Sequence, residues 1–340
     1  MLKVLESPPA GLLDAQPADL QALFGAPTLL HLPGRRPEPL FVSVLLHGNE
    51  DTGYFAVRDL LRRHRDKGLP RALSIFFGNL AAAEHGLRRL DGQPDYNRVW
   101  PGSEVAATPE HALMAQVVEA MQRRGVFASV DVHNNTGINP HYGCVNRIDY
   151  RYLHLATLFS RTVVYFTRPR GVQSLAFSRL CPAVTIECGQ PGQPQGVAHA
   201  ADYLEACLRL AEIPVHPVPA HDIDLFHTVA IVKVPERTSF AFGDRQGDIR
   251  FLPDLDHFNF RELPEGAQLG WVDGPHGVPL EAWDETGKDI SARFFMVEDG
   301  RLRLRRAVMP SMFTLDERVI RQDCLGYLME RYQLVDAEQA

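Results

Sequence analysis

The chain has 340 residues, 45% of them hydrophobic, so it is long enough for two domains with buried cores. A formal net charge of -7 argues against a nucleic-acid-binding surface, and no apolar stretch is long enough for a transmembrane helix. The five cysteines form no CxxC pair, and the N-terminus lacks the continuous apolar region of a signal peptide. We therefore expect a cytoplasmic protein.

Residues 1–38 are rich in proline, glycine and leucine and predict an irregular lead-in. Beyond them, short apolar strands alternate with helices: strands at 40–46, 72–77, 126–132, 162–166 and 182–187, and helices at 52–65, 110–123 and 197–211, with a long loop at 78–108. Continuously apolar strands that alternate with helices indicate a sheet covered on both faces. The predicted fold class is α/β, with a mostly parallel or mixed sheet flanked by helices, over residues 1–212.

The composition changes at 213–221, where three prolines in nine residues predict a linker. Residues 222–340 contain mostly strand-type segments, among them HTVAIVKV, QLGWV and RFFMVEDGRLRLRRAVM. The last of these has a turn signal at Asp299-Gly300. Its alternating RLRLRR predicts a half-exposed strand rather than a surface for nucleic acid. We expect a small β-rich domain here.

Two of the predicted strands deliver a histidine at their C-terminal end. The first strand ends at His47, and Glu50 follows three residues later in HGNE; a later strand ends at His133. Ligands of open α/β sheets bind at the carboxyl ends of strands, and two histidines with one carboxylate are a usual ligand set for catalytic zinc. The sequence therefore predicts a metal site of these three residues. Asp131, two residues before His133, is placed to orient an imidazole.

Charged residues at two further places extend this pattern. The strand AVTIE ends in Glu187, which suits a general base that takes a proton from water and returns it to a leaving nitrogen. The loop RRLDGQPDYNRVWPG carries Arg88, Arg89 and Arg98. Arginine binds carboxylates through two hydrogen bonds and stabilises a developing oxyanion. Each residue alone has an ordinary interpretation as a loop or surface charge, but together they indicate a catalytic site.

The order of these motifs resembles that of a known family. HGNE, NRVWPG, DVHNNTG and TIECGQPGQPQG follow one another between Phe41 and Leu204. The pattern is similar to that of the zinc-dependent succinylglutamate desuccinylase/aspartoacylase family, a branch of the carboxypeptidase-A-like metallohydrolases. The resemblance implies a zinc carboxypeptidase-like catalytic domain with a β-rich domain after it. It also implies one Zn²⁺ per chain on His47, Glu50 and His133, with Glu187 as the general base.

The resemblance assigns roles in the arginine-rich loop as well. Asn97 and Arg98 match the family's Asn-Arg pair, which holds the substrate's carboxylate. The family also has an arginine, followed by an aromatic, an aliphatic and an acidic residue, that polarises the scissile carbonyl. Arg88 matches this arginine best. Arg89 also fits, because the spacing from Arg88 to Asn97 is longer than the resemblance leads us to expect.

One position departs from the family pattern. Aspartoacylases carry an arginine ten residues before the catalytic glutamate, where it binds the second carboxylate of aspartate, and here that residue is Phe177. Arg168, Arg170 and Arg179 are candidates to replace it. Phe177 has two interpretations: it forms the wall of an apolar pocket, which favours a less charged substrate, or it packs in the core.

The predicted function is hydrolysis of the amide bond of an N-acyl amino acid by metal-activated water, with a glutamate as general base. Two alternatives stay open. The first alternative is a metallocarboxypeptidase or a peptidoglycan-peptide amidase that uses the same residues. The second is a non-catalytic protein that binds zinc or another ligand. The expected partner is a small N-acyl amino acid or a short peptide-like substrate, without nucleic acid or membrane.

Overall fold

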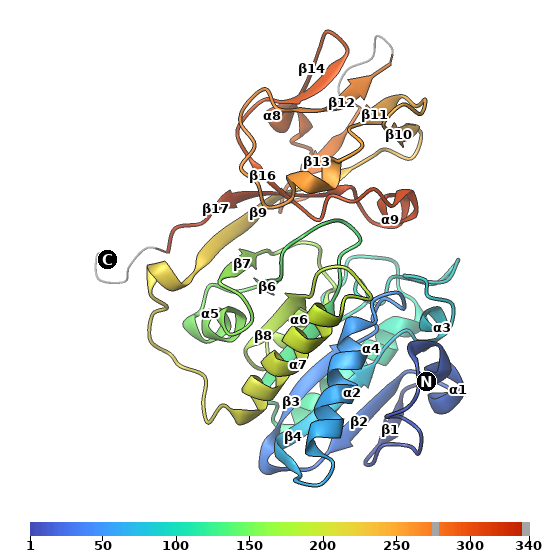
Figure 1. Ribbon diagram of the computed structural model, residues 1–340, viewed down its shortest axis with the longest axis vertical. Helices are drawn as coiled ribbons and strands as arrows, with labels where there is room; N and C mark the ends of the chain where they lie inside the picture. Colours follow the sequence, from blue (N-terminus) through green and yellow to red (C-terminus); the bar gives the residue numbers. More distant parts are fainter. Residues whose placement is uncertain (274–278, 335–340) are drawn as a thin grey trace. The chain divides into compact units, whose positions relative to one another are not determined.

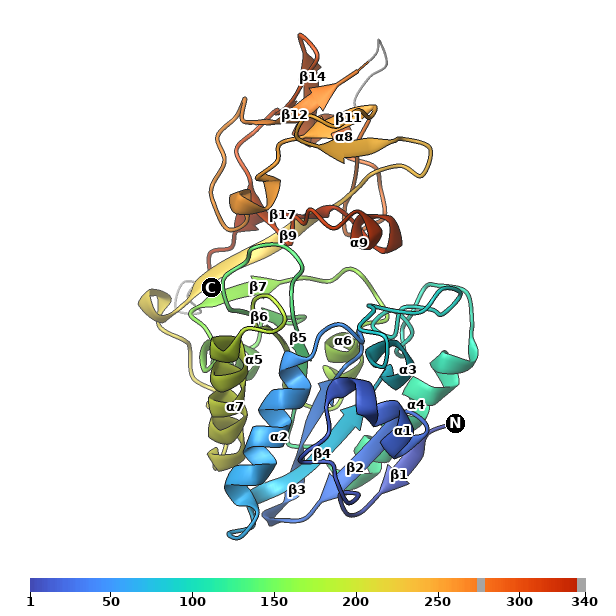
Figure 2. The same cartoon turned by 45° about the vertical axis from the view of Figure 1, so that its right-hand side comes forward.

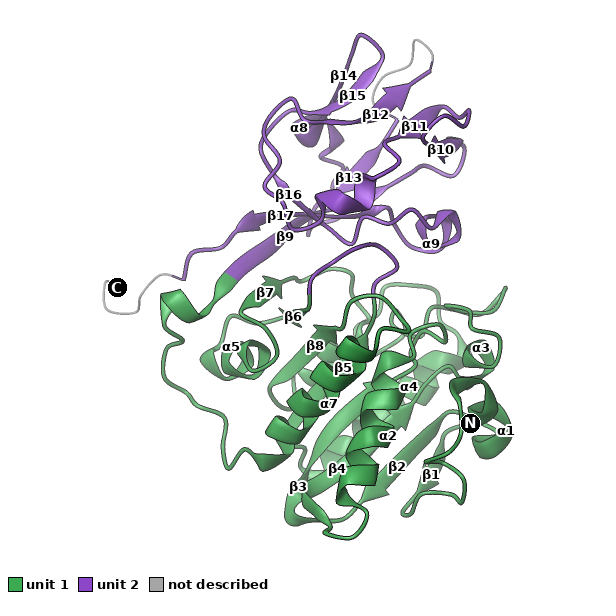
Figure 3. Ribbon diagram, viewed as in Figure 1, with its two compact units in different colours: residues 1–134, 141–224 green, residues 135–140, 225–340 purple. Residues whose placement is uncertain are grey.

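The computed structural model describes residues 1–273 and 279–334 (Figures 1 and 2). The chain divides into two compact units (Figure 3). Unit 1 comprises Met1–Asn134 and His141–Asp224, and unit 2 comprises Asn135–Pro140 and Leu225–Ala340. Within the predicted β-rich domain, 274–278 and 335–340 lie outside the described residues. No helix in the described ranges is both long and apolar enough to cross a membrane.

The strands of unit 1 lie in the order β1-β2-β4-β3-β5-β8-β6-β7. Their bounds are β1 Lys3–Leu5, β2 Thr28–Leu32, β3 Gly34–Val44, β4 Leu69–Phe77, β5 Ala128–His133, β6 Tyr142–Val145, β7 Thr162–Tyr165 and β8 Ala183–Glu187. β3 is parallel to β4 and to β5, and β5 is parallel to β8. β2 with β4 and β6 with β8 are antiparallel pairs. The predicted mixed, mostly parallel sheet is confirmed.

Helices cover both faces of this sheet. They are α1 Leu20–Phe24, α2 Thr52–His64, α3 Leu80–Ala83, α4 Pro109–Arg124, α5 Tyr150–Thr157, α6 Gln173–Phe177 and α7 Pro194–Arg209, with short 3₁₀ turns at Pro17–Asp19 and Ala220–Asp222. α2 approaches the sheet at Gly53, where a Cβ would lie 2.9 Å from Val44 and from Val132. α6 packs on the opposite face, because Phe177 stacks on Phe41, and strand residues three apart point to opposite faces. α2 and α7 lie side by side (Figure 2).

The lead-in at 1–38 is not irregular, so that prediction was wrong. It contains β1, α1 and β2, and β2 pairs with both β1 and β4. Leu29 and Leu30 of β2 are fully buried. The run TLLHL is short and flanked by prolines and glycines, which obscured a buried strand that tertiary pairing stabilises.

Unit 2 is built mainly from strands, as predicted. One sheet has the order β10-β11-β12-β15-β14, and in another group β9 pairs with β13 and β17, and β17 with β16. Their bounds are β9 Asp224–Lys233, β10 Phe240–Phe242, β11 Ile249–Phe251, β12 Gln268–Val272, β13 Glu281–Trp283, β14 Phe295–Glu298, β15 Arg301–Leu304, β16 Met309–Ser311 and β17 Gly326–Arg331, with helices α8 Ser291–Phe294 and α9 Glu317–Gln322 and a 3₁₀ turn at Leu255–Phe258. The turn at Asp299-Gly300 joins β14 to β15, and β15 alternates between exposed and buried residues. Both predictions for this segment are confirmed.

Phe177 belongs to the core of unit 1. Its side chain is fully buried, lies 4.3 Å from the Phe41 ring at an interplanar angle of 10°, and meets Trp100 edge-on at 6.0 Å. Of the two interpretations of this position, core packing is therefore the one that the structure shows.

We expect Phe177→Ala to lower the free energy of unfolding by about 3–5 kcal/mol, because it leaves a cavity between two aromatic rings. Phe177→Leu should cost less, since it keeps most of the apolar volume. Urea-induced unfolding of the full chain, followed by circular dichroism, measures both, because the longest helices belong to unit 1. A loss below about 1 kcal/mol in the alanine variant would contradict the core assignment.

Candidate metal centre and active site

The HGNE turn leaves β3 through a tightly packed bend. Leu45 has a positive φ of 56° directly after the strand. A Cβ at Gly48 would lie 2.2 Å from the backbone nitrogen of Ala83, so only glycine fits there. The Gly48 N–H donates to the Arg88 carbonyl at 3.2 Å. This bend holds the HGNE turn against the loop that carries Arg88.

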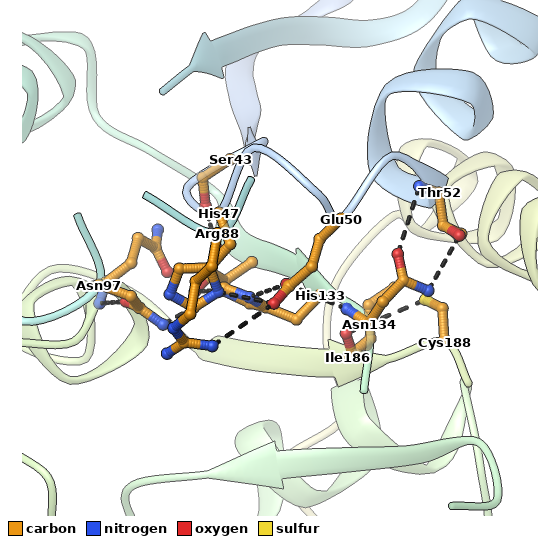
Figure 4. A network of polar contacts seen from close by, with 12 residues as sticks. Ser43, His47, Glu50, Thr52, Arg88, Asn97, His133, Asn134, Ile186 and Cys188 are labelled. Carbon is orange, nitrogen blue, oxygen red and sulfur yellow. Dashed lines mark hydrogen bonds and ion pairs between the residues drawn. The ribbon is translucent and has the colours of Figure 1, made fainter. Parts of the chain in front are cut away.

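The structure brings His47, Glu50 and His133 together (Figure 4). Glu50 lies between the two imidazoles: its Oε1 is 2.7 Å from His47 Nδ1, and its Oε2 is 2.6 Å from His133 Nδ1. All three side chains are buried, and one ligand atom of each lies within 4.8 Å of the others. Two imidazole nitrogens and a carboxylate oxygen, gathered at the ends of β3 and β5, suit a divalent metal ion with an open coordination position.

Both imidazoles turn their other nitrogen toward a second carboxylate. His47 Nε2 lies 3.0 Å from Asp95 Oδ1, and His133 Nε2 lies 2.8 Å from Asp131 Oδ2. Metal-ligating histidines usually donate their second ring N–H in this way, which fixes the tautomer and the ring orientation. Nδ1 of each ring is therefore the atom that faces the candidate metal position.

The charges of the centre are strongly coupled. Burial and the Arg88 charge act to lower the pKa of His47, but Glu50 and Asp95 outweigh them and raise it. Burial likewise opposes a charged His133, yet Asp131 and Glu50 raise its pKa well above the usual value. Burial would raise the pKa of Glu50, but the two histidines bring it below its usual range. Without a metal ion, the two imidazoles hold protons to higher pH than ordinary histidines.

Glu187 ends β8 directly beside His133, its partner in the β5–β8 register. The side chain is 5% exposed, and burial raises the pKa of its carboxyl to about 8, with Glu50 and Asp131 also raising it and the two histidines lowering it. A carboxyl with a raised pKa next to a cluster of metal ligands is suited to accept and return a proton.

Arg88 and Arg89 have different surroundings. Arg88 Nη2 donates to Asp95 at 2.9 Å, and its Nη1 lies 3.8 Å from Glu50 Oε1. Arg89 Nη1 donates to the Gln93 carbonyl at 2.6 Å within its own loop. The loop is therefore folded so that Arg88 faces Glu50 of the candidate metal centre.

Asn97 also lies at the centre, beside His133. Its Oδ1 accepts the backbone N–H of Gln173 at 3.0 Å, and its Nδ2 is 3.2 Å from His133 Nε2. Since His133 Nε2 donates to Asp131, this second contact is not a hydrogen bond. The neighbouring Arg98 donates through Nη1 to the Asn97 carbonyl at 2.9 Å.

The candidate substitutes for the arginine missing at 177 are placed differently from one another. Arg168 and Arg170 both pair with Glu104, at 2.6 Å and 2.9 Å. The segment that carries them packs on the Asn-Arg loop, because the backbone N–H of Trp100 donates to the Gly171 carbonyl at 3.0 Å. The guanidinium of Arg179 lies near Gly102, with Nη2 3.8 Å from where a Cβ of residue 102 would be.

Sequence reasoning missed two residues of this centre. Asp95 receives hydrogen bonds from Arg88 and the Asn97 backbone as well as facing His47. Asn134 donates its backbone N–H to Glu50 at 3.1 Å, and its side-chain Nδ2 donates to the Gly189 carbonyl at 2.9 Å. Their signal in the sequence was adjacency: each lies one or two residues from a residue that a motif had already identified.

Comparisons with known proteins agree with this geometry. Residues 39–206 match the sequence profile described as the succinylglutamate desuccinylase/aspartoacylase catalytic domain. That span contains every ligand candidate and Glu187. The chain belongs to the succinylglutamate desuccinylase/aspartoacylase family. No curated protein matches the sequence significantly.

Solved structures of this family share the fold at low sequence identity. A succinylglutamate desuccinylase/aspartoacylase from Rhodobacter sphaeroides has a TM-score of 0.60 at 18% identity, over 90% of this chain and 88% of the other. Succinylglutamate desuccinylase from Chromobacterium violaceum gives 0.58 at 18%, over 88% and 86%. Murine aminoacylase 3 gives 0.56 at 16%, over 88% and 97%. The fold class predicted from the sequence is that of the family.

We expect the full chain to bind one zinc ion, and His47→Ala to lose it. Since His47 and His133 hold their protons more tightly than usual without metal, zinc must displace those protons, and its apparent affinity should rise as the pH increases through and above the ordinary histidine pKa of about 6.5. Competition with a chromophoric chelator at several pH values measures this. An affinity independent of pH, or retained in His47→Ala, would contradict the site.

Proposed function

We propose that the chain is a zinc-dependent hydrolase that cleaves the amide bond of an N-acyl amino acid. The observation that carries the proposal is the buried group of His47, Glu50 and His133 with Glu187 beside it on the next strand. A bound zinc ion would supply Lewis acidity to this group. The family match over the catalytic domain supports the reaction class.

Proton transfer is assigned to Glu187. Its buried carboxylate takes a proton from the attacking water and later delivers it to the departing nitrogen, so that the nitrogen leaves as a neutral amine and not as an anion. Glu187 on β8 is the register partner of His133 on β5, and this pairing keeps the carboxyl next to the candidate metal position. Burial in the sheet keeps this carboxyl available in its protonated form after the first transfer.

The arginines divide binding and stabilisation between them. Arg88, held by Asp95 beside Glu50, stabilises the negative charge that develops on the carbonyl oxygen. Asn97 and Arg98 orient a free carboxylate of the substrate, as charge-assisted hydrogen bonds from arginine favour. The pair Arg168 and Arg170, on the segment packed against this loop, favours a substrate with a further negative group.

A metallocarboxypeptidase or peptidoglycan-peptide amidase would use the same residues on a peptide. The sequence-based argument for it was an apolar pocket wall at Phe177, but that side chain is fully buried between aromatic rings. Without that wall, the arginine-rich loop favours small acidic N-acyl amino acids over peptides.

A panel of N-acetyl and N-succinyl amino acids, assayed beside dipeptides, tests the proposal. We expect release from acidic N-acyl amino acids, and a loss of about 10²–10⁴ in kcat for Glu187→Gln with zinc still bound. Turnover of dipeptides alone would favour the peptidase. Zinc bound without turnover of any amide would favour a non-catalytic binding protein, and unchanged turnover in Glu187→Gln would remove the base assignment.

Arg88→Ala and Arg89→Ala form a matched pair for the second assignment. We expect Arg88→Ala to lower kcat by about 10²–10³, because a charged donor to the oxyanion is lost. Arg89→Ala should change kcat much less, since Arg89 donates to the Gln93 carbonyl within its loop. Steady-state kinetics on the best substrate of the panel measures both. A larger loss in Arg89→Ala would reverse the assignment.

A further inference from the structure

Ser43 is a polar residue in an otherwise apolar part of a central strand. It lies in the run Leu40-Phe41-Val42-Ser43-Val44 of β3, which has β4 on one side and β5 on the other. Its side chain is fully buried. A hydroxyl buried in the middle of a sheet costs free energy unless it makes a hydrogen bond. The bond that it makes should therefore show why a serine stands here.

That bond goes to the carboxylate behind His133. Ser43 Oγ donates to Asp131 Oδ1 at 2.6 Å, and the two residues are direct neighbours in the β3–β5 register. Asp131 Oδ2 accepts from His133 Nε2 at 2.8 Å. Ser43, Asp131 and His133 thus form one continuous chain of hydrogen bonds that leads from the interior of the sheet to the candidate metal position.

Ser43 supplies the hydrogen bond to Oδ1 of Asp131, the carboxylate oxygen that does not face His133. On the other side of Asp131, the register neighbour on β8 is Thr185, but its hydroxyl donates to Ser174 at 3.0 Å. Within the described ranges, the side chain of Asp131 accepts hydrogen bonds from Ser43 and His133. Asp131 is 0% exposed, so no solvent replaces a lost donor.

Two donors on two oxygens fix the plane of a carboxylate. With Oδ1 held by Ser43, Asp131 cannot rotate freely about its χ2 bond, and Oδ2 stays in line with His133 Nε2. The ring of His133 is then held so that Nδ1 faces Glu50 and the ring of His47, at a centroid distance of 5.1 Å. Figure 4 shows Ser43 on the far side of this group from Asn134.

We propose that Ser43 is a positioning residue of the metal centre, which holds Asp131 so that His133 presents Nδ1 to the metal ion. The inference rests on the proposed metal site and not on the identity of the substrate. Ser43 touches neither metal nor substrate in this role. It acts through Asp131. Asp131 is the carboxylate that orients the histidine, and Ser43 lies behind that carboxylate.

The test compares Ser43→Thr with Ser43→Val in the full chain. The two side chains have nearly the same shape, and both β-branched residues suit a strand, but only threonine keeps the hydroxyl. We expect Ser43→Thr to bind zinc with nearly the wild-type dissociation constant and Ser43→Val to bind it about tenfold more weakly. Chelator competition measures the constants. Ser43→Ala, which adds no atoms to the core, gives the same comparison against wild type should the larger variants not fold.

A matched control separates positioning from simple loss of stability. Ser74 on β4 is another buried serine bonded to a histidine, with its Oγ 2.8 Å from His31 Nδ1, and His31 is no metal ligand. Ser74→Ala should lower the melting temperature of the metal-free protein without changing zinc affinity. The visible absorption spectrum of the cobalt-substituted protein should differ between Ser43→Val and wild type, because it reports ligand geometry, and should be unchanged in Ser74→Ala.

Equal zinc affinities and equal cobalt spectra for Ser43→Thr and Ser43→Val would overturn the role of Ser43 and leave the metal site intact. A wild-type protein that takes up no zinc or cobalt would overturn the metal site and this inference with it. A protein that binds zinc as expected but hydrolyses no amide would remove the proposed reaction while the effect of Ser43→Val on zinc affinity still stands.

Discussion

The centre depends on the balance of buried charge around Glu50. This carboxylate lies between His47 and His133, and each imidazole is in turn bonded to a further carboxylate, the partly buried Asp95 or the fully buried Asp131. Isolated buried charges are costly, so each of these groups is stable only with its partner. A divalent ion that displaces one proton from each imidazole leaves the total charge unchanged. The same arrangement therefore suits the metal-free protein, in which the pKa of both imidazoles is raised, and the metal-loaded one.

The parallel strands place the side chains of the centre at one edge of the sheet. β3, β5 and β8 are adjacent and end at the same edge of the sheet, so His47, His133 and Glu187 arrive there from segments far apart in the sequence. The β5–β8 register places His133 beside Glu187. Asp131 lies two residues earlier on the same face of β5, and the β3–β5 register places it beside Ser43. The ligands and the residues behind them are thus two successive rows of one sheet face. Changes in the second row act on the first through hydrogen bonds.

The sequence pointed to the residues at the strand ends and to Asp131 behind them, but not to Ser43 or Asp95. His47, Glu50, His133 and Glu187 stand out because charged or imidazole side chains end apolar strands. Asp95 lies in a loop without regular structure, and the only signal for it in the sequence was its place two residues before Asn97. The fold was predicted in outline for the same reason: alternation of strands and helices is local, whereas the pairing that makes β2 a buried strand is not.

Phe177 shows how a motif position and a structural position differ. Counting ten residues back from Glu187 reaches α6, whose aromatic end packs against Phe41 and Trp100 rather than toward the ligands. An arginine there would have to be buried in an aromatic cluster, which its charge disfavours. Position 177 of this chain is therefore a core position and not one that faces the candidate metal centre. The segment between β7 and α6 carries Arg168 and Arg170, and both pair with Glu104.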